Sequence, residues 1–147
     1  MSDKYQSADL ILKLYDLRRE EKMRVAREWF VGFLPESAAD IVGAMVSPET
    51  SSKFRMAISY WDMAASMVNH GAIDEEMFRD AGGEYLIFFS KIEPFLAELR
   101  EMLGNPRFLG NLEKLVMSQP DAQEMLGKTR ERIKAMVQRR AEMAKAS

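Results

Sequence analysis

The sequence predicts an all-α fold, a single-domain bundle of five to seven helices. Apolar residues recur at helical spacing along the chain, and no stretch alternates apolar and polar residues as a half-buried strand does. Helix-starting and helix-ending residues interrupt this pattern, among them Pro48, Gly71 and Pro120. The 147 residues can bury one sizeable core, and no Pro-, Gly- or Ser-rich linker divides them.

The N-terminal half predicts three helices. The first begins at Ser7, a good N-cap residue, and ends before Pro35. A short helix over 36–46 follows, and then a longer one over 48–70. This third helix is apolar over most of its circumference, which predicts a central, Trp/Met-rich helix around Trp61. We expect its methionines to fill the core rather than to line an adaptable binding groove.

The next part of the chain predicts three more helical segments. Asp74 is expected to cap one helix, which Gly82-Gly83 breaks before helical structure resumes over 84–103. Pro94 lies inside that span and is expected to kink the helix without ending it. Asn105-Pro106 is expected to cap the following helix.

The last helix, opened by Pro120, is strongly basic. Residues 128–147 carry 7 basic and 2 acidic side chains, a net charge of +5, whereas the other 14 basic and 21 acidic residues give the rest of the chain −7. We therefore divide the domain into a helical bundle over 1–127 and a basic C-terminal helix or tail over 128–147. The candidate contacts to an anionic partner are Lys128, Arg130, Arg132, Lys134, Arg139 and Arg140.

A strip of residues in this tail recurs at alternating spacings of three and four: Leu126, Thr129, Ile133, Met136, Arg140 and Met143. Such a strip is typical of a coiled-coil seam, of a helix on a membrane surface or of a nucleic-acid contact. A solvated terminal helix, partly docked on the bundle, is the plain alternative. The strip has no aromatic side chain, which disfavours stacking on bases.

Few residues are suited to chemistry. With one histidine and no cysteine, a single chain offers no disulfide, thiolate nucleophile or multi-histidine metal site, and we expect neither metal nor cofactor. His70 is expected to end a helix, where an imidazolium favours the dipole, rather than to act in catalysis. Asp62 is either a desolvated acid suited to proton transfer or a structural residue of a polar strip or ion pair, and we favour the structural role.

Two charged residues interrupt the apolar face of the first helix. At 100° per residue, Arg18 and Glu21 point along the same face as Leu14 and Val25. Either this turn emerges from the body of the protein, or the two charges are paired in the interior or across an interface. A buried charge needs a partner, so the second interpretation predicts an ion pair of Arg18 and Glu21.

Several cap and packing motifs resemble those of a known family. The run His70-Gly71-Ala72-Ile73-Asp74-Glu75-Glu76-Met77-Phe78, with Gly83-Glu84-Tyr85, Glu93-Pro94-Phe95 and Asn105-Pro106, resembles an uncharacterised bacterial all-helical family, domain-of-unknown-function family four-seven-six-zero. The resemblance covers about residues 8–118. It implies an all-helical fold and supplies no activity, cofactor or catalytic residue. Members of that family often carry N-terminal membrane segments, and this sequence predicts none.

These observations favour a non-enzymatic helical interaction or regulatory module, self-associating or bound to a protein partner. No signal peptide and no apolar stretch of about 20 residues is evident, so a cytoplasmic location is expected. The alternative is a small ligand-binding protein or enzyme with a pocket between the third and fourth helices, lined by Trp61, Asp62, His70 and Tyr85. A third hypothesis is an electrostatic tether to anionic lipid or nucleic acid through residues 128–147.

Overall fold

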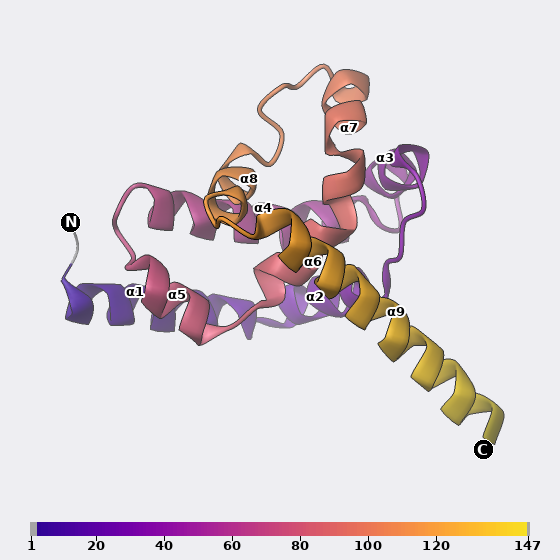
Figure 1. The fold of residues 1–147 in the computed structure, drawn as a ribbon, viewed down its shortest axis with the longest axis horizontal. Helices are drawn as coiled ribbons and strands as arrows, with labels where there is room; N and C mark the ends of the chain where they lie inside the picture. The colour runs from indigo at the N-terminus through magenta and orange to yellow at the C-terminus, as the bar shows by residue number, and fades with distance from the viewer. Residues whose placement is uncertain (1–2, 147) are drawn as a thin grey trace.

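The computed structural model describes residues 3–146, and their regular secondary structure is entirely helical. The predicted all-α, single-domain fold is confirmed (Figure 1). The described residues form nine α-helices and one 3-10 helix in the order α1 (Lys4–Arg18), α2 (Glu21–Gly32), α3 (Ala38–Val46), α4 (Ser51–Asn69), α5 (Glu75–Ala81), α6 (Glu84–Ile92), η1 (Glu93–Phe95), α7 (Leu96–Leu103), α8 (Gly110–Met117) and α9 (Ala122–Ala146). The described part therefore has more helices than the predicted five to seven, because two predicted helices are interrupted.

The first predicted helix is divided into α1 and α2. The break falls at Glu20, whose carboxylate accepts a hydrogen bond from the Met23 N–H at 3.1 Å and so caps α2. The prediction that Ser7 caps α1 is wrong, since Asp3 forms that cap. Ser7 is instead buried within α1, and its hydroxyl accepts a hydrogen bond at 2.9 Å from the backbone N–H of Asp74. That bond joins α1 to the start of α5.

Pro94 has a larger effect than the predicted kink. α6 ends at Ile92, one 3-10 turn follows, and α7 begins at Leu96. A proline has no N–H to donate to the carbonyl four residues earlier, which here is the carbonyl of Ser90. That carbonyl accepts a hydrogen bond from Nη1 of Arg130 at 3.2 Å. The proline thus leaves free the carbonyl to which α9 binds.

Two predicted helix starts are also wrong. α4 begins at Ser51, after a turn over residues 48–50, and α8 begins at Gly110 rather than after Asn105-Pro106. Asn105 does accept a hydrogen bond from the Arg107 N–H at 3.1 Å, but this closes only a turn. Asp74 caps α5 as predicted, and the break at Gly82-Gly83 is confirmed.

The core is formed mainly around α4 and α6. α4 packs against α2, α3, α5 and α8, and its buried side chains are aromatic residues, Ala, Ile and Val. Its methionines lie at the margin of this face, and Met63 is 41% exposed. α6 buries Phe88 and Phe89 completely, and the Phe88 ring stacks on Phe30 of α2 with centroids 4.4 Å apart.

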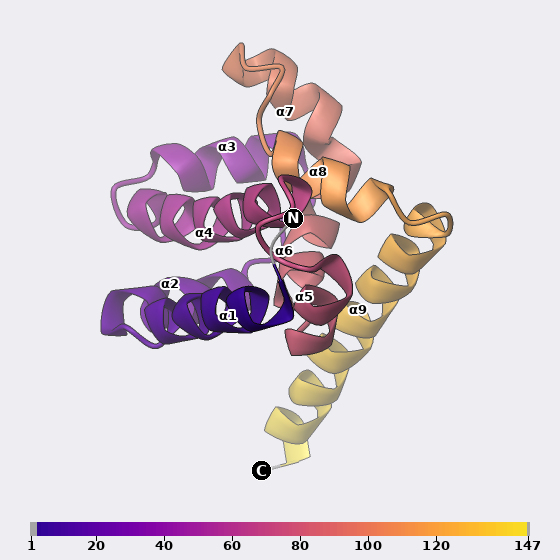
Figure 2. The same cartoon turned by 90° about the vertical axis from the view of Figure 1, so that its left-hand side faces the viewer.

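α9 is the most extended element of the fold. It lies across α6, and its C-terminal half projects beyond the other helices (Figures 1 and 2). Its buried side chains, those of Ala122, Leu126 and Thr129, all lie in its first third. The helix continues through Gly127 without interruption. Within residues 3–146, no helix is both long and apolar enough to cross a membrane.

Candidate functional site: a groove beside the C-terminal helix

Trp61 lies in a closed, fully hydrogen-bonded cluster. Its indole Nε1 donates to Oε1 of Glu84 at 3.1 Å, and Arg27 donates to both oxygens of the same carboxylate, at 2.7 and 2.8 Å. The Arg27 and Glu84 side chains are 19% and 18% exposed. The hydrogen bond to Glu84 raises the pKa of the Arg27 guanidinium, against the opposing effect of burial. This pair joins α2 to the start of α6.

The predicted pocket residues do not converge on one cavity. Tyr85 is buried against Phe78 and lies near Trp61, and burial raises the pKa of its hydroxyl. Asp62 is engaged elsewhere, accepting hydrogen bonds at 3.0 Å from Asn111 Nδ2 and from the Leu112 N–H. His70 is exposed at the C-cap of α4, which confirms that it ends a helix.

The space beside Trp61 is small. It has a volume of about 30 Å³ and is lined by side chains of α1, α4 and α5, without Asp62, His70 or Tyr85. A cavity of that size holds about one water molecule rather than an organic substrate. Among the described residues, no group of His, Asp or Glu side chains is arranged to hold a metal ion.

Arg18 and Glu21 lie on opposite sides of the break between α1 and α2. Glu21 is exposed, whereas Arg18 is half-buried with its guanidinium 5.0 Å from the ring centroid of Tyr15 and 5.8 Å from that of Trp61. Within residues 3–146 the two do not form an ion pair with each other. Two partly buried pairs between different helices are present among the described residues, Arg27–Glu84 and Arg100–Glu113. Pairing of Arg18 and Glu21 across an interface stays a prediction.

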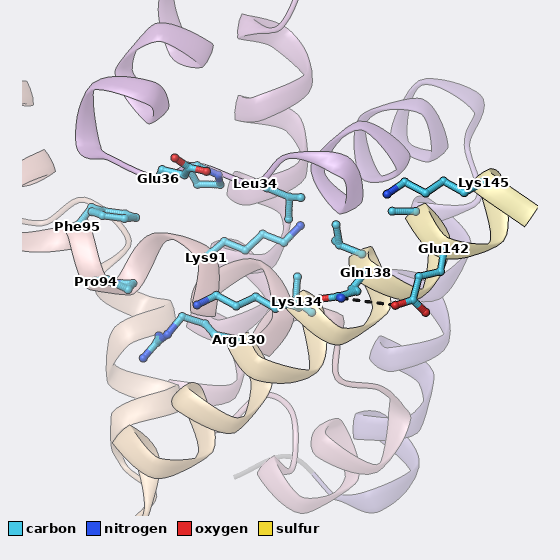
Figure 3. A pocket seen from close by; sticks show the side chains of 14 residues that line it. Leu34, Glu36, Lys91, Pro94, Phe95, Arg130, Lys134, Gln138, Glu142 and Lys145 are labelled. Carbon is cyan, nitrogen blue, oxygen red and sulfur yellow. Dashed lines mark hydrogen bonds between the residues drawn. The ribbon is translucent and has the colours of Figure 1, made fainter.

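A large groove runs along one side of α9. It has a volume of about 760 Å³, within the range of small-molecule pockets, and more than half of its wall is apolar. Figure 3 shows α9 along one side of it and the connection between α2 and α3 along the other. Its apolar lining comprises Leu34, Pro35, Pro94, Phe95, Ile133, Val137 and Ala141.

Lys91 of α6 lines this groove and is only 7% exposed. Its ammonium Nζ donates to the carbonyls of Phe30 and Val31 at 2.7 and 2.8 Å, at the C-terminal end of α2, and the Phe30 carbonyl also accepts a hydrogen bond from the Phe33 N–H at 3.1 Å. Burial lowers the pKa of Lys91 to about 8, and the charge of Glu84 opposes that change. Among residues 3–146 no carboxylate lies within ion-pair distance of this ammonium.

The six predicted contacts to an anionic partner are distributed over different faces of α9. Arg130 and Lys134 line the groove, and Lys145, which was not among the six, does so as well. Lys128 forms an ion pair with Glu124 at 3.1 Å, and Arg132 donates to the Thr129 hydroxyl at 3.3 Å. The two line a second hollow that also contains three carboxylates. The remaining two, Arg139 and Arg140, are exposed outside both hollows.

The apolar strip predicted along α9 is likewise divided. Leu126 and Thr129 are buried, and Ile133 is half-buried in the groove. Met136 and Met143 are 52% and 72% exposed. Within the described residues, the strip therefore packs on the bundle at its N-terminal end and is exposed to solvent farther along.

The fold and this groove define a class of protein, a helical domain that carries a long, partly docked C-terminal helix. A family model described as "Domain of unknown function (DUF4760)" matches residues 5–118, so the chain belongs to that family. No curated protein and no solved structure matches the chain significantly. The family match ends before α9, so one side of the groove lies within the matched region and the other side lies outside it.

Proposed function

We propose that this protein is a non-enzymatic helical interaction module, which binds a protein partner in the groove beside α9. The observation that carries the proposal is the groove itself, an open and mainly apolar hollow of about 760 Å³. Apolar side chains along it, such as Leu34 and Val137, are 46% and 40% exposed. Clustered exposed apolar surface of this kind is typical of protein interaction sites.

Two alternatives receive less support. An enzyme with a pocket around Trp61 and Asp62 would need these side chains to face one cavity, whereas they bond to different neighbours. An electrostatic tether would gain most from basic side chains gathered on one face of α9, whereas they are distributed over several. The cytoplasmic location and any self-association stay predictions.

A peptide selection tests the proposal even while the partner is unidentified. Peptides from a random display library are selected on the immobilised full chain, and their affinities are measured by fluorescence anisotropy. Val137→Arg places a charge in the groove and is expected to weaken the selected peptides by about tenfold or more. The matched control is Leu12→Arg on α1, at a side chain that is 66% exposed, and it should leave binding unchanged.

Either of two results would overturn the proposal. One is the failure of the selection to yield any binding peptide. The other is a set of peptides that bind the Val137→Arg variant as well as the unmodified chain, because such peptides would occupy a different surface.

A further inference from the structure

We infer that the partner of this groove is an acidic amphipathic helix of another protein, which lays its apolar face on the groove and directs carboxylates toward Lys91, Arg130, Lys134 and Lys145. The inference rests on the proposed function and specifies the chemistry of the partner. It is argued from three observations: the shape of the groove, its charge, and the lack, among residues 3–146, of a carboxylate partner for its two least exposed cations.

The shape of the groove fits a helix. Its lining residues on α9 extend from Arg130 to Lys145 at intervals of three and four, so they form one continuous face of that helix. At 1.5 Å per residue this face is about 22 Å long, the length of a helix of about 16 residues. A helix packed alongside α9 would cover both the apolar side chains of this face and the connection between α2 and α3.

The charge of the groove favours an acidic partner. Four basic side chains line it, against the two carboxylates of Glu36 and Glu142. Glu142 accepts a hydrogen bond from Gln138 at 3.5 Å, drawn as the dashed line in Figure 3. In the same view Lys91 extends from α6 into the space below Leu34.

The two least exposed cations of the groove lack a carboxylate partner. Lys91 donates to the carbonyls of Phe30 and Val31, and Arg130 donates to the carbonyl of Ser90. Among the described residues neither forms an ion pair. Glu84, the carboxylate whose charge acts on Lys91, is already bound by Arg27 and Trp61. A desolvated cation without a counter-ion is unfavourable, so a carboxylate from outside would be stabilised here.

A second copy of this chain fits the groove less well if it offers its own C-terminal helix. Residues 128–147 carry a net charge of +5, so two such segments side by side would repel each other. A membrane surface also fits less well, because Arg139 and Arg140 lie outside the groove. An acidic helix is the occupant that satisfies both the apolar wall and the cations.

The test uses defined peptides and the full chain. The probe is a fluorescent helical peptide of about 16 residues with leucine along one face and glutamate beside it. Its controls are the same peptide with lysine in place of glutamate, and a scrambled acidic peptide. Fluorescence anisotropy at low and at physiological salt is expected to show the acidic helix binding about tenfold or more tightly than either control.

Two charge-reversal variants locate the binding. Lys134→Glu with Lys145→Glu changes two exposed groove residues and should weaken the acidic helix by about tenfold or more. Arg139→Glu with Arg140→Glu makes the same change in net charge outside the groove and should have an effect of less than about threefold. Neither pair is buried, so both variants should keep the thermal unfolding temperature of the unmodified chain.

The remaining outcomes separate this inference from the proposed function. Equal losses in the two variants, or equal binding of the basic or scrambled peptide, would overturn the acidic-helix inference. So would displacement of the peptide from the groove by palmitate or by phosphatidylglycerol vesicles, since the groove would then belong to a lipid. If library-selected peptides still lost affinity on Val137→Arg, the interaction module would stand with a partner of different chemistry. If the affinities of the library-selected peptides were also unchanged by Val137→Arg, both proposals would fail.

Discussion

The Trp61 cluster and the groove beside α9 both contain partly buried cations. A carboxylate binds the cation in the cluster, whereas, within residues 3–146, only backbone carbonyls accept hydrogen bonds from the two least exposed cations of the groove. In the cluster, Arg27 meets the carboxylate of Glu84 through two hydrogen bonds, and the indole of Trp61 adds a third. In the groove, Lys91 and Arg130 have only backbone carbonyls as hydrogen-bond acceptors among the described residues. Arg27 and Glu84 thus neutralise each other within the chain, whereas the groove retains an excess of positive charge.

The two regions also differ in packing. Beside Trp61 the free volume is about 30 Å³, whereas beside α9 it is about 760 Å³. A closed and neutralised site contributes to stability, and a partly desolvated, charged and open one is a place where a partner can add both apolar contact and counter-charge. We therefore expect changes in the cluster to affect folding and changes in the groove to affect binding.

The largest effect is expected from Trp61→Ala. Trp61 is 5% exposed, and its removal should lower the free energy of unfolding by about 3–5 kcal/mol through lost transfer energy and the cavity left behind. For a chain of this size that corresponds to a fall in Tm of about 10 °C or more, measurable by circular dichroism. A Tm within a couple of degrees of that of the unmodified protein would show that the Trp61 cluster does not stabilise the fold as expected.

The Arg27–Glu84 pair should couple strongly. Arg27→Met or Glu84→Gln alone should cost about 2–3 kcal/mol, because each leaves a partly buried charge unpaired, and the double change should cost less than the sum. A double-mutant cycle followed by urea unfolding measures this coupling. The same cycle on Arg18→Met and Glu21→Gln should be additive in the monomer. Coupling that grows with protein concentration would place that second pair in an interface.

Local signals in the sequence predicted the parts of the fold that depend on neighbouring residues. Asp74 caps α5 through the Met77 N–H at 2.9 Å, and Gly71 takes a φ of 81° after α4. The charged turn at Arg18 and Glu21 interrupts an apolar face in the sequence, and the helix in fact breaks between these residues. Such features depend on side chains a few positions apart, which a pattern can reveal.

Long-range partners explain what the sequence did not predict. Lys91 was missed because its two carbonyl acceptors lie 61 and 60 residues earlier in the chain. Its one visible signal is a single lysine within the apolar run from Tyr85 to Ile92. The start of α8 was misplaced for a similar reason, since the N–H of Leu112 is bound by Asp62, 50 residues earlier, rather than by Asn105.

Lys91→Met should change the pH dependence of stability. Burial lowers the folded pKa of Lys91 from 10.5 to about 8, so between about pH 8 and 10.5 the unfolded chain binds more protons than the folded one. The stability of the unmodified protein, measured relative to the Lys91→Met variant, should therefore rise over that window. The expected gain is about 1–2 kcal/mol, because hydrogen bonds to two carbonyls partly favour the ammonium.

Urea unfolding of both proteins at pH 7.5 and at pH 10 measures this difference. A bound acidic peptide should reduce the gain, since a carboxylate near Nζ favours the charged form. If the difference in stability between the unmodified protein and Lys91→Met did not depend on pH, the Lys91 ammonium would be as well stabilised in the fold as in water. Lys91 would then lack no counter-charge, and the groove would not differ in this respect from the Arg27–Glu84 pair.

Truncation after Gly127 should have a much smaller effect on stability than Trp61→Ala. The shortened chain loses one buried side chain, Thr129, and the hydrogen bond of Arg130 to Ser90, while Ala122 and Leu126 remain in place. The cost should be about 1–2 kcal/mol, and the fluorescence of Trp29 and Trp61 should be unchanged because the ring partners of both lie earlier in the chain. Binding of the acidic peptide should disappear, since α9 supplies one side of the groove. Loss of the folded body would show that residues 128–146 are part of its core, and retained peptide binding would place the interaction elsewhere on the protein.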